Sequence, residues 1–441
     1  MFTVSAPVTR AAGQVARDTT LANGLQVYVA ENHRLPEATV TVAVRTGAFT
    51  QEPSQDGLAH LYEHLLFRGY PRGQAAFDRE TGFIEAGYNG ETTVDYVDYF
   101  LELPSARATD AVKILARLVR NARFSESDLK AERPIVLDEL ARDASTPLSR
   151  FERQVQERLW GTSWSRLDVG GDSATVSALS LATLQSQFTR YYVPNNMALI
   201  VSGDVSTAAI WKAAADAFGD WGRAPEAPAP PTAYPPLQQS SFVLIAAQVT
   251  DVTIVIASQG PAHSPADSDA VPVLMMAAVL NNPVSAFQAR LTGSGLFQSV
   301  HCSYVGHRYD RTSELRARVS ADHAPDAVVK LLNEVSVLDA MSGIGEEDLG
   351  FALRATTVGE AIDDQEVTGL AEALAYWWGG PGLGAYDAFD RRLAAVKLAD
   401  VTRVAGAYVS SKPHVIGILG PRAALEAVRA RLVAGSKGGR P

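Results

Sequence analysis

The chain has 441 residues, with 39 Lys and Arg against 49 Asp and Glu, which gives a formal net charge of -10. The acidic balance and the lack of a clustered basic run argue against a nucleic-acid-binding protein, because phosphate contacts need grouped Lys and Arg. A single cysteine, Cys302, excludes an internal disulfide framework and a cysteine-based zinc site, so a bound metal would need His and carboxylate ligands.

Two further properties bear on the cellular location. The longest apolar stretch, 271–280, contains a proline and is well short of the roughly 20 residues that span a bilayer, so we expect a soluble protein without a membrane span. The first residues of the chain lack the apolar core of a signal peptide. We therefore expect a cytoplasmic protein, or a periplasmic one whose signal peptide has been removed, and we slightly favour the periplasm.

The domain organisation follows from a proline-rich stretch at 221–239, WGRAPEAPAPPTAYPPLQQ, which favours extended backbone over helix or sheet. We interpret this stretch as a linker between an N-terminal domain, 1–220, and a C-terminal domain, 240–441. Each of these domains is long enough to bury a hydrophobic core of its own.

In both halves, β-branched and alternating residues predict strands, and a helical periodicity predicts helices between them. In the first half, the expected elements are strands at 25–31 and 38–48, a helix at 57–67, a strand at 92–103, a helix at 106–119, a helix after Ser125 and a strand at 196–203. In the second half, they are strands at 242–248 and 252–260, a helix at 267–280 and strands at 316–319 and 414–420. We predict an α+β protein of two similar domains, each a mixed, mostly antiparallel sheet covered by helices on one face.

The most informative segment reads DGLAHLYEHLLFRG and begins at Asp56. It predicts a short helix, with Asp56 as its N-terminal cap and Gly69 as its left-handed end. His60, Glu63 and His64 share one face of this helix, because positions three and four apart lie together. The pattern fits either the solvated face of an amphipathic helix or one half of a metal site.

A catalytic zinc ion takes three protein ligands and leaves a fourth position open, so two His residues need a third ligand from elsewhere. The helix after Ser125 offers Glu132 and Glu139, which lie two turns apart on one face. Pro134 lies between them and predicts a kink or a restart of the helix, since proline cannot donate the helical hydrogen bond. Acidic residues on such a helix usually face solvent, but their combination with the two His residues favours a metal site.

Together, His60-x-x-Glu63-His64 and Glu132-Arg-x-x-Val-x-x-Glu139 resemble the inverted zinc motif of the pitrilysin/insulinase family of metallopeptidases, in particular its two-domain subfamily around mitochondrial processing peptidase and its bacterial relatives. The resemblance implies a zinc-dependent endopeptidase that binds one Zn²⁺ per chain. It implies that His60, His64 and Glu139 are the zinc ligands, that Glu132 supports them and that Glu63 is the general base. A further metal ligand is the alternative role for Glu63.

The segment Asn89-Gly90-Glu91-Thr92 resembles the family's Asn-Ala-x-Thr edge strand, with Gly90 in place of the usual alanine. The resemblance implies that Asn89, Gly90 and Thr92 bind an extended peptide substrate by strand addition, which recognises backbone more than side chains. An ordinary sheet edge is the alternative interpretation.

Active relatives carry an Arg, followed seven residues later by a Tyr, that helps to hold the substrate carbonyl. In the matching segment these positions are Leu291 and Gln298, while Arg290 is one position off and Tyr304 is too far along the chain. The resemblance therefore implies a heterodimer, in which a homologous subunit without the zinc motif supplies the Arg/Tyr pair. Two alternatives remain open: a non-catalytic subunit like the core subunits of respiratory complexes, and a peptidase dedicated to processing one precursor.

Overall fold

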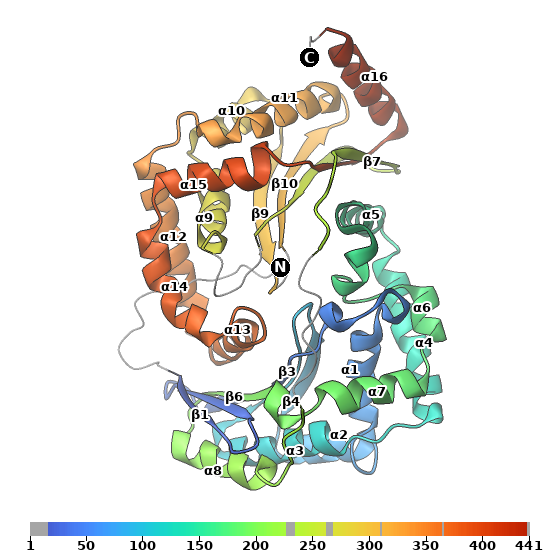
Figure 1. The fold of residues 1–441 in the computed structure, drawn as a ribbon, viewed down its shortest axis with the longest axis vertical. Helices are drawn as coiled ribbons and strands as arrows, with labels where there is room; N and C mark the ends of the chain where they lie inside the picture. The colour runs from blue at the N-terminus through green and yellow to red at the C-terminus, as the bar shows by residue number, and fades with distance from the viewer. Residues whose placement is uncertain (1–15, 226–233, 262–267, 309–310, 364–365, 439–441) are drawn as a thin grey trace.

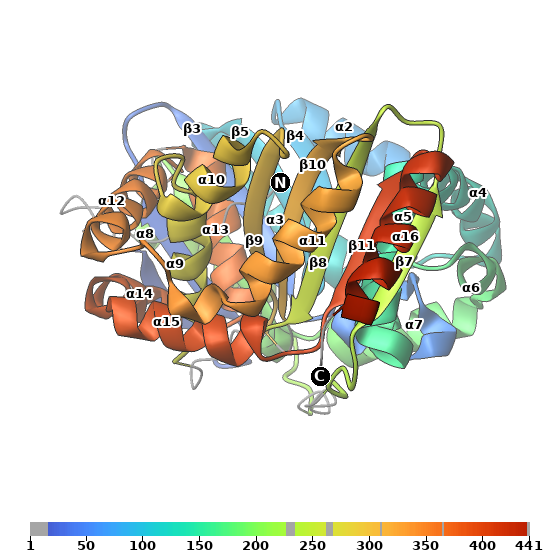
Figure 2. The same ribbon diagram turned by 90° about the horizontal axis from the view of Figure 1, so that it is seen from above.

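Two β-sheets, one from each half of the chain, stand as two layers with helices around them (Figure 1). Seen from above, the second half lies over the first (Figure 2). The computed structural model describes residues 16–225, 234–261, 268–308, 311–363 and 366–438.

Six strands form the first sheet: β1 (Arg17–Thr20), β2 (Gln26–Glu31), β3 (Glu37–Val44), β4 (Gly87–Thr92), β5 (Val97–Pro104) and β6 (Met197–Gly203). Five strands form the second sheet: β7 (Ser241–Ala246), β8 (Asp251–Gln259), β9 (Ser299–Gly306), β10 (Arg311–Ser320) and β11 (Val415–Gly420). Their spatial orders are β1-β2-β6-β3-β5-β4 and β7-β11-β8-β10-β9.

The first half contributes the helices α1 (Leu58–Arg68), α2 (Gln74–Phe83), α3 (Ala108–Asn121), α4 (Glu126–Asp143), α5 (Pro147–Trp160), α6 (Ser173–Ala178), α7 (Leu181–Tyr191) and α8 (Thr207–Phe218). The second half contributes α9 (Ala270–Asn281), α10 (Ala286–Leu291), α11 (Ala324–Ser336), α12 (Glu346–Asp363), α13 (Val367–Gly379), α14 (Leu383–Ala395), α15 (Leu398–Ala405) and α16 (Arg422–Gly438).

The two sheets follow one plan. In each, a single parallel pair, β2 with β6 and β7 with β11, is joined to strands that pair antiparallel. The spatial order β2-β6-β3-β5-β4 corresponds to β7-β11-β8-β10-β9. The predicted fold class, an α+β protein of two similar domains with mixed and mostly antiparallel sheets, is confirmed.

Alternation along the strands separates the two faces of the first sheet. Val27 and Val29 of β2 and Val40 of β3 belong to the core that the helices of the first half close, including α1 and α3. The intervening residues Tyr28 and Ala30 belong to the core of the second half. At the centre of the first sheet, both faces are therefore buried: one by the core of the first half and the other by the core of the second half.

Each sheet receives on its inner face a helix from the other half. Helix α13 packs on β3 and β6, and α5 packs on β7, β8 and β11. Gly417 of β11 makes the second contact possible, because a Cβ there would lie 2.7 Å from Cζ of Phe151 and 2.6 Å from Cγ2 of Val155. This exchange of helices joins the two halves through both of their sheets.

Trp378 is the centre of the contact between the halves. Its indole Nε1 donates a 2.6 Å hydrogen bond to Oε1 of Gln26, and its carbonyl accepts one of 2.9 Å from Arg45. The Arg45 guanidinium lies over the Trp378 ring, 4.1 Å from its centroid. The neighbouring Trp377 is also buried, so this tryptophan pair belongs to the core and not to an open surface.

Most of the predicted elements are confirmed, with one strand divided. The strand expected at 92–103 is instead the end of β4, a turn and β5. Thr93 closes this turn, since its amide and its hydroxyl both donate to the carbonyl of Tyr96, at 2.8 and 2.9 Å. The structure also shows no restart at Pro134, because α4 is continuous through that residue.

Both predicted ends of the motif helix are wrong. The N-cap of α1 is Gly57, with a φ of 84°, and not Asp56. The buried side chain of Gln51 takes over the capping role, because its Oε1 accepts a 3.0 Å hydrogen bond from the amide of Ala59. Gly69 has a φ of -75° and is therefore right-handed, with its amide still bonded to the carbonyl of Leu65.

The predicted linker lies between α8 and β7, and its residues 226–233 are outside the described part of the chain.

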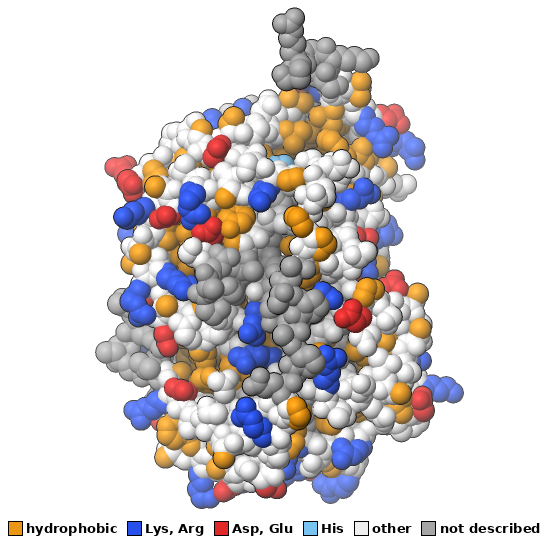
Figure 3. All heavy atoms as spheres, in the orientation of Figure 1, with side chains coloured by type: hydrophobic (Ala, Val, Ile, Leu, Met, Phe, Trp, Pro, Cys, Tyr) orange, Lys and Arg blue, Asp and Glu red, His pale blue; other side chains and the backbone are white. Residues whose placement is uncertain are grey.

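The length and apolar character of the described helices bear on whether the chain could span a membrane. No single helix in the described ranges has the length and apolar character needed to cross a membrane. Among the described helices, one pair meets that criterion jointly: α9, and α10 together with the turn after it, across a bend of 48°. Acidic and basic side chains are interspersed over the face drawn in Figure 3.

Candidate metal centre

Helix α1 places His60, Glu63 and His64 on the side that faces α4. Its other face is fixed by Leu58, Leu61 and Leu65, which are fully buried and belong to the core of the first half. The side chains therefore divide as the sequence predicts, with apolar residues inward and the motif residues together. The rings of His60 and His64 are 4.9 Å apart and nearly perpendicular.

Helix α4 lies beside α1 (Figure 1) and packs against it. This packing brings Glu139 to the two imidazoles. Oε2 of Glu139 lies 3.4 Å from Nε2 of His64 and 3.8 Å from Nε2 of His60. One ligand atom from each of these residues lies within 4.8 Å of the others. Two imidazoles and a carboxylate at this separation match the donor set that a catalytic zinc ion takes.

Glu132 supports this arrangement from behind His64. Its Oε1 lies 3.0 Å from Nδ1 of His64, and its Oε2 accepts a hydrogen bond from Nε of Arg68. A proton on Nδ1 of His64, donated to Glu132, would leave Nε2 free to bind a metal. The sequence reasoning missed Arg68, although its place one turn after His64 on the same helix was the available signal.

Glu63 lies beside the metal group but is almost fully buried, with 8% of its surface exposed. Burial raises the pKa of its carboxyl group, while the hydroxyl of Thr92 opposes this by donating a 2.8 Å hydrogen bond to Oε2. The other oxygen, Oε1, faces Gly90, where an added Cβ would lie 3.0 Å away. Glu63 therefore touches the edge strand that the sequence assigned to substrate binding.

Strand β4 carries Asn89, Gly90 and Thr92 and is the last strand of the first sheet. Among the strands that the structure describes, it pairs on one side only, with β5. The structure thus brings all the predicted site residues to one edge of the first sheet: the metal group, Glu132, Glu63 and the three residues of β4.

The segment aligned with the Arg/Tyr pair has no side chains of that kind at the expected places. Leu291 is fully buried at the end of α10, and Gln298 contacts Asp251. Arg290 is held by Glu334, at 3.0 Å, and Tyr304 donates to the carbonyl of Pro261. The two nearest substitutes in the sequence are therefore engaged within the second half.

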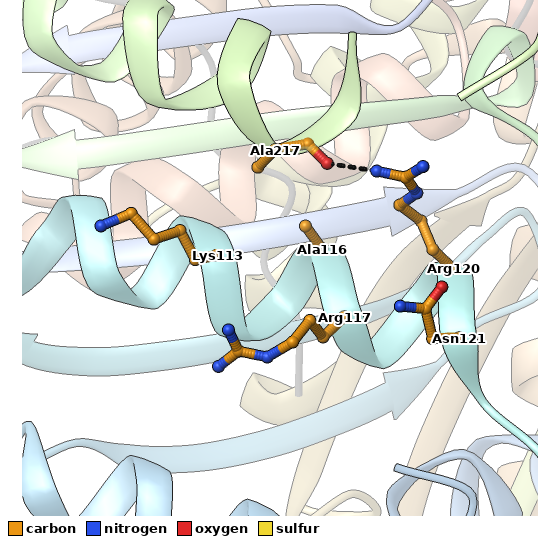
Figure 4. A pocket seen from close by; sticks show the side chains of 6 residues that line it. All are labelled: Lys113, Ala116, Arg117, Arg120, Asn121 and Ala217. Atoms are coloured by element: carbon orange, nitrogen blue, oxygen red, sulfur yellow. Dashed lines mark hydrogen bonds between the residues drawn. The ribbon is translucent and has the colours of Figure 1, made fainter. Parts of the chain in front are cut away.

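One surface cavity lies on the outer side of α3 (Figure 4). Its basic residues already have partners: Arg117 pairs with Glu80, and Arg120 bonds to the carbonyl of Ala217 and to Asp220. The cavity has none of the metal-site residues and supports no function here. Its lining residues are Lys113, Ala116, Arg117, Arg120, Asn121 and Ala217.

Comparisons with known proteins agree with this geometry. Residues 26–168 match the family model described as insulinase (peptidase family M16), and residues 178–355 match the model described as peptidase M16 inactive domain. The chain therefore belongs to the insulinase family of peptidases, as its motif predicted.

Among its curated relatives is an uncharacterised zinc protease of Mycobacterium tuberculosis, 29% identical over 226 residues that are 50% of this chain and 52% of that protein. The probable mitochondrial-processing peptidase subunit beta of Arabidopsis thaliana is 26% identical, over 46% of this chain and 37% of that protein. Cytochrome b-c1 complex subunit 1 of Bos taurus is 30% identical, over 42% of this chain and 38% of that protein. The matches thus span about half or less of the length of these relatives.

Solved structures share the fold. A protease from Helicobacter pylori has a TM-score of 0.82 and 18% identity, covering 92% of this chain and 100% of that chain. The periplasmic protease PqqL from Escherichia coli has a TM-score of 0.77 and 18% identity, covering 97% of this chain and 50% of that chain. At these identities the likeness establishes the fold alone.

Proposed function

We propose that this chain is a zinc-dependent endopeptidase that acts as the metal-bearing subunit of a heterodimer. The observation that carries the proposal is the convergence of His60, His64 and Glu139, with ligand atoms within 4.8 Å of one another, beside the buried Glu63. Membership of the insulinase family supports zinc as the metal. One Zn²⁺ per chain would be held by these three residues.

Three protein ligands would leave a zinc ion one position open for water and substrate. A Zn²⁺ ion held by these residues would supply Lewis acidity to the scissile carbonyl and would lower the pKa of water toward about 7. Glu132 fixes the ring of His64 and, by accepting from Nδ1, directs Nε2 to the metal position. Arg68 in turn holds Glu132 in place.

Glu63 acts as the general base in this proposal. Its carboxylate takes a proton from the attacking water and returns it to the leaving amine. Thr92 occupies Oε2, so Oε1 is the oxygen available for this transfer. The raised pKa of Glu63 favours the role, since a base works best when its proton affinity is close to the working pH.

An extended peptide would bind along β4. No strand of the described ranges pairs with its outer side, so its backbone can accept another strand next to Glu63. Asn89 and Gly90 would contact the peptide, and Thr92 would link this strand to the base. Backbone recognition permits varied substrate sequences.

The partner is a homologous subunit that carries the Arg/Tyr pair and lacks the zinc motif. This follows from Leu291, whose side chain has no hydrogen-bond donor, and from Gln298, whose side-chain amide already donates to Asp251 at 3.2 Å. Removal of one such donor typically costs about 10²–10³ in rate. The isolated chain is then expected to be only weakly active.

The test is a reconstitution experiment. The zinc-loaded chain is assayed on quenched-fluorescent peptides alone, with a candidate partner, and with that partner after Glu63→Gln. We expect cleavage only in the mixture with the unchanged chain. Rapid turnover by the chain alone would contradict the heterodimer, although not the peptidase.

A second candidate is a non-catalytic subunit, which is favoured by the similarity to cytochrome b-c1 complex subunit 1. Stable complex formation with full zinc occupancy, but without cleavage of any peptide, would support it. A peptidase dedicated to one precursor is the third possibility. It would cut that precursor at a single site and leave a mixed peptide pool intact.

A further inference from the structure

The inner face of the first sheet carries carboxyl groups at its open edge. Glu91 of β4 and Asp98 of β5 are direct partners across the two strands. Side chains of such partners leave the sheet on the same face, with Cβ atoms about 4.5–5.5 Å apart. That this face looks toward α13 follows from Glu102, which is four residues after Asp98 and so on the same face of β5. Its carboxylate accepts a 2.6 Å hydrogen bond from Thr368 at the start of that helix.

Helix α13 adds a third carboxyl group, that of Glu372. Its charge raises the pKa of Glu91, second to burial, and that of Asp98, after burial and the charges of Glu91 and Glu63. We call Glu91, Asp98 and Glu372 the acidic subsite. Two of its members come from the first half of the chain and one from the second.

Asp98 is the unusual member of the acidic subsite. Only 2% of its surface is exposed, and its Oδ1 has no hydrogen-bond partner within the described residues. The charged neighbours that act on it, Glu91, Glu63 and Glu372, are all acidic. Buried carboxylates are normally paired or hydrogen-bonded, so this one lacks a cation.

The position of the subsite next to β4 indicates what kind of cation fits. A peptide that adds to β4 points every second side chain to the inner face, beside Glu91, and neighbouring strands are about 4.8 Å apart. Asp98 is one strand further in, on β5, about 10 Å from a strand added to β4, so only a side chain as long as that of Lys or Arg would approach it. A metal ion is less suitable, because the only described residues whose ligand atoms converge closely enough for one are His60, His64 and Glu139.

We propose that Glu91, Asp98 and Glu372 form a specificity subsite that binds one Lys or Arg side chain of the peptide substrate. This proposal rests on the proposed function, since it assumes that a peptide adds to β4. The cationic side chain gives Asp98 a charge-assisted partner, which a neutral side chain of the same length cannot do. The subsite thus selects substrates by side chain, whereas the β4 backbone does not.

The test measures binding without cleavage, in the full-length zinc-loaded chain carrying Glu63→Gln. The probes are fluorescent peptide pools with mixed residues at all positions except one, which is fixed as Lys, Arg, norleucine or citrulline. We expect the Lys and Arg pools to bind about 10- to 100-fold more tightly than the neutral pools. The preference should decrease with added salt.

Adding Glu91→Gln and Asp98→Asn should reduce that preference to about twofold or less, while the neutral pools keep their affinity. Glu37→Gln is the matched control, because it removes a carboxylate from the exposed end of β3, about 20 Å along the strand from Ala43, the partner of Asp98. If the double variant does not fold in a thermal melt, Glu372→Gln takes its place, because Glu372 is itself exposed and its replacement should not disturb the core.

Equal binding of cationic and neutral pools would overturn the subsite, as would a Lys and Arg preference that survives in the variants. Since binding is read in a chain that cannot cleave, a lack of peptidase activity in the reconstitution experiment does not affect this result. Conversely, an unselective chain that still cleaves peptides would leave the peptidase proposal intact.

Discussion

Thr92 donates a 2.8 Å hydrogen bond to Oε2 of Glu63, although 29 residues separate them in the chain. The bond joins the candidate base on α1 to the edge strand β4, where a peptide would add. Both partners are buried, so the bond is protected from water. The position of the base is thereby coupled to the strand that would hold the substrate.

The first prediction concerns this hydrogen bond. Thr92→Val keeps the shape of the side chain but removes the donor, and we expect kcat/KM for peptide cleavage to fall about 10- to 100-fold with zinc content unchanged. Thr92→Ser retains the hydroxyl and should stay close to the original activity. Equal activity of the Val and Ser variants would show that the bond does not position the base.

The second prediction distinguishes the roles of Glu132 and Glu139, the two carboxylates of α4 at the candidate metal centre. Glu139→Gln should abolish stable zinc binding, because it removes a direct ligand. Glu132→Gln should weaken zinc binding about 10- to 100-fold, because it only loosens the ring of His64. Competition with a chromophoric chelator measures both affinities. Full affinity in the Glu139→Gln variant would remove this residue from the ligand set.

The third prediction concerns Gly90, which faces Glu63. A Cβ at Gly90 would lie 3.0 Å from Oε1 of Glu63, so the carboxylate has to shift by a few tenths of an ångström in Gly90→Ala. We expect a small effect for alanine and a loss of about 10- to 100-fold in kcat/KM for Gly90→Val, whose branches displace the base further. Zinc content, measured alongside, should be normal in both variants.

The fourth prediction concerns the stability of the loop before α1. Burial, followed by the charge of Asp168, raises the pKa of Asp56 to about 7, whereas the unfolded value is about 3.9. Between about pH 4 and pH 7, the Asp56 carboxyl group is therefore protonated in the folded state and ionised in the unfolded state. Its contribution to the free energy of unfolding decreases as pH rises through this interval, so this residue makes the protein less stable.

Asp56→Asn removes the titrating group. The free energy of unfolding of the variant, relative to the original chain, should rise by ~1–3 kcal/mol across that interval. Urea unfolding at several pH values measures the difference. Two profiles that stay parallel from pH 4 to 8 would contradict the prediction.

The fifth prediction tests the contact between the halves. Trp378→Ala removes a side chain of which 1% is exposed, and it should lower the free energy of unfolding by ~3–5 kcal/mol. Trp378→Phe loses mainly the bond to Gln26 and should cost less, about 1–3 kcal/mol. Because α5 and α13 are exchanged between the sheets, both halves should unfold in one transition. Two separate transitions in the unchanged chain would argue against this coupling.

Local sequence was sufficient for much of the site. The spacing of His60, Glu63 and His64 determines that they share a helix face, since that relation depends only on the helical repeat. The same holds for Glu132 and Glu139 on α4, where the helix continues through Pro134. The alternating residues of β2 and β3 likewise indicated strands with buried faces.

Other relations depend on packing between distant segments, which no local pattern encodes. Gln51 caps α1 in place of Asp56, because the preceding loop folds back over the helix start. Asp98 reads in the sequence as an ordinary polar residue of a strand. Its burial, and an Oδ1 that has no hydrogen-bond partner among the described residues, depend on α13, which comes from the other half and covers the sheet.

By itself, then, the sequence determined the chemistry and the family of this protein: two imidazoles, three carboxylates and the helices that carry them, since residue type and helical repeat are local properties. Only the tertiary structure decided that Glu139 meets His64, 75 residues earlier, and that Glu63 meets Thr92. The reason is that the burial of α1 and α4 against a common core sets the distance between their polar faces.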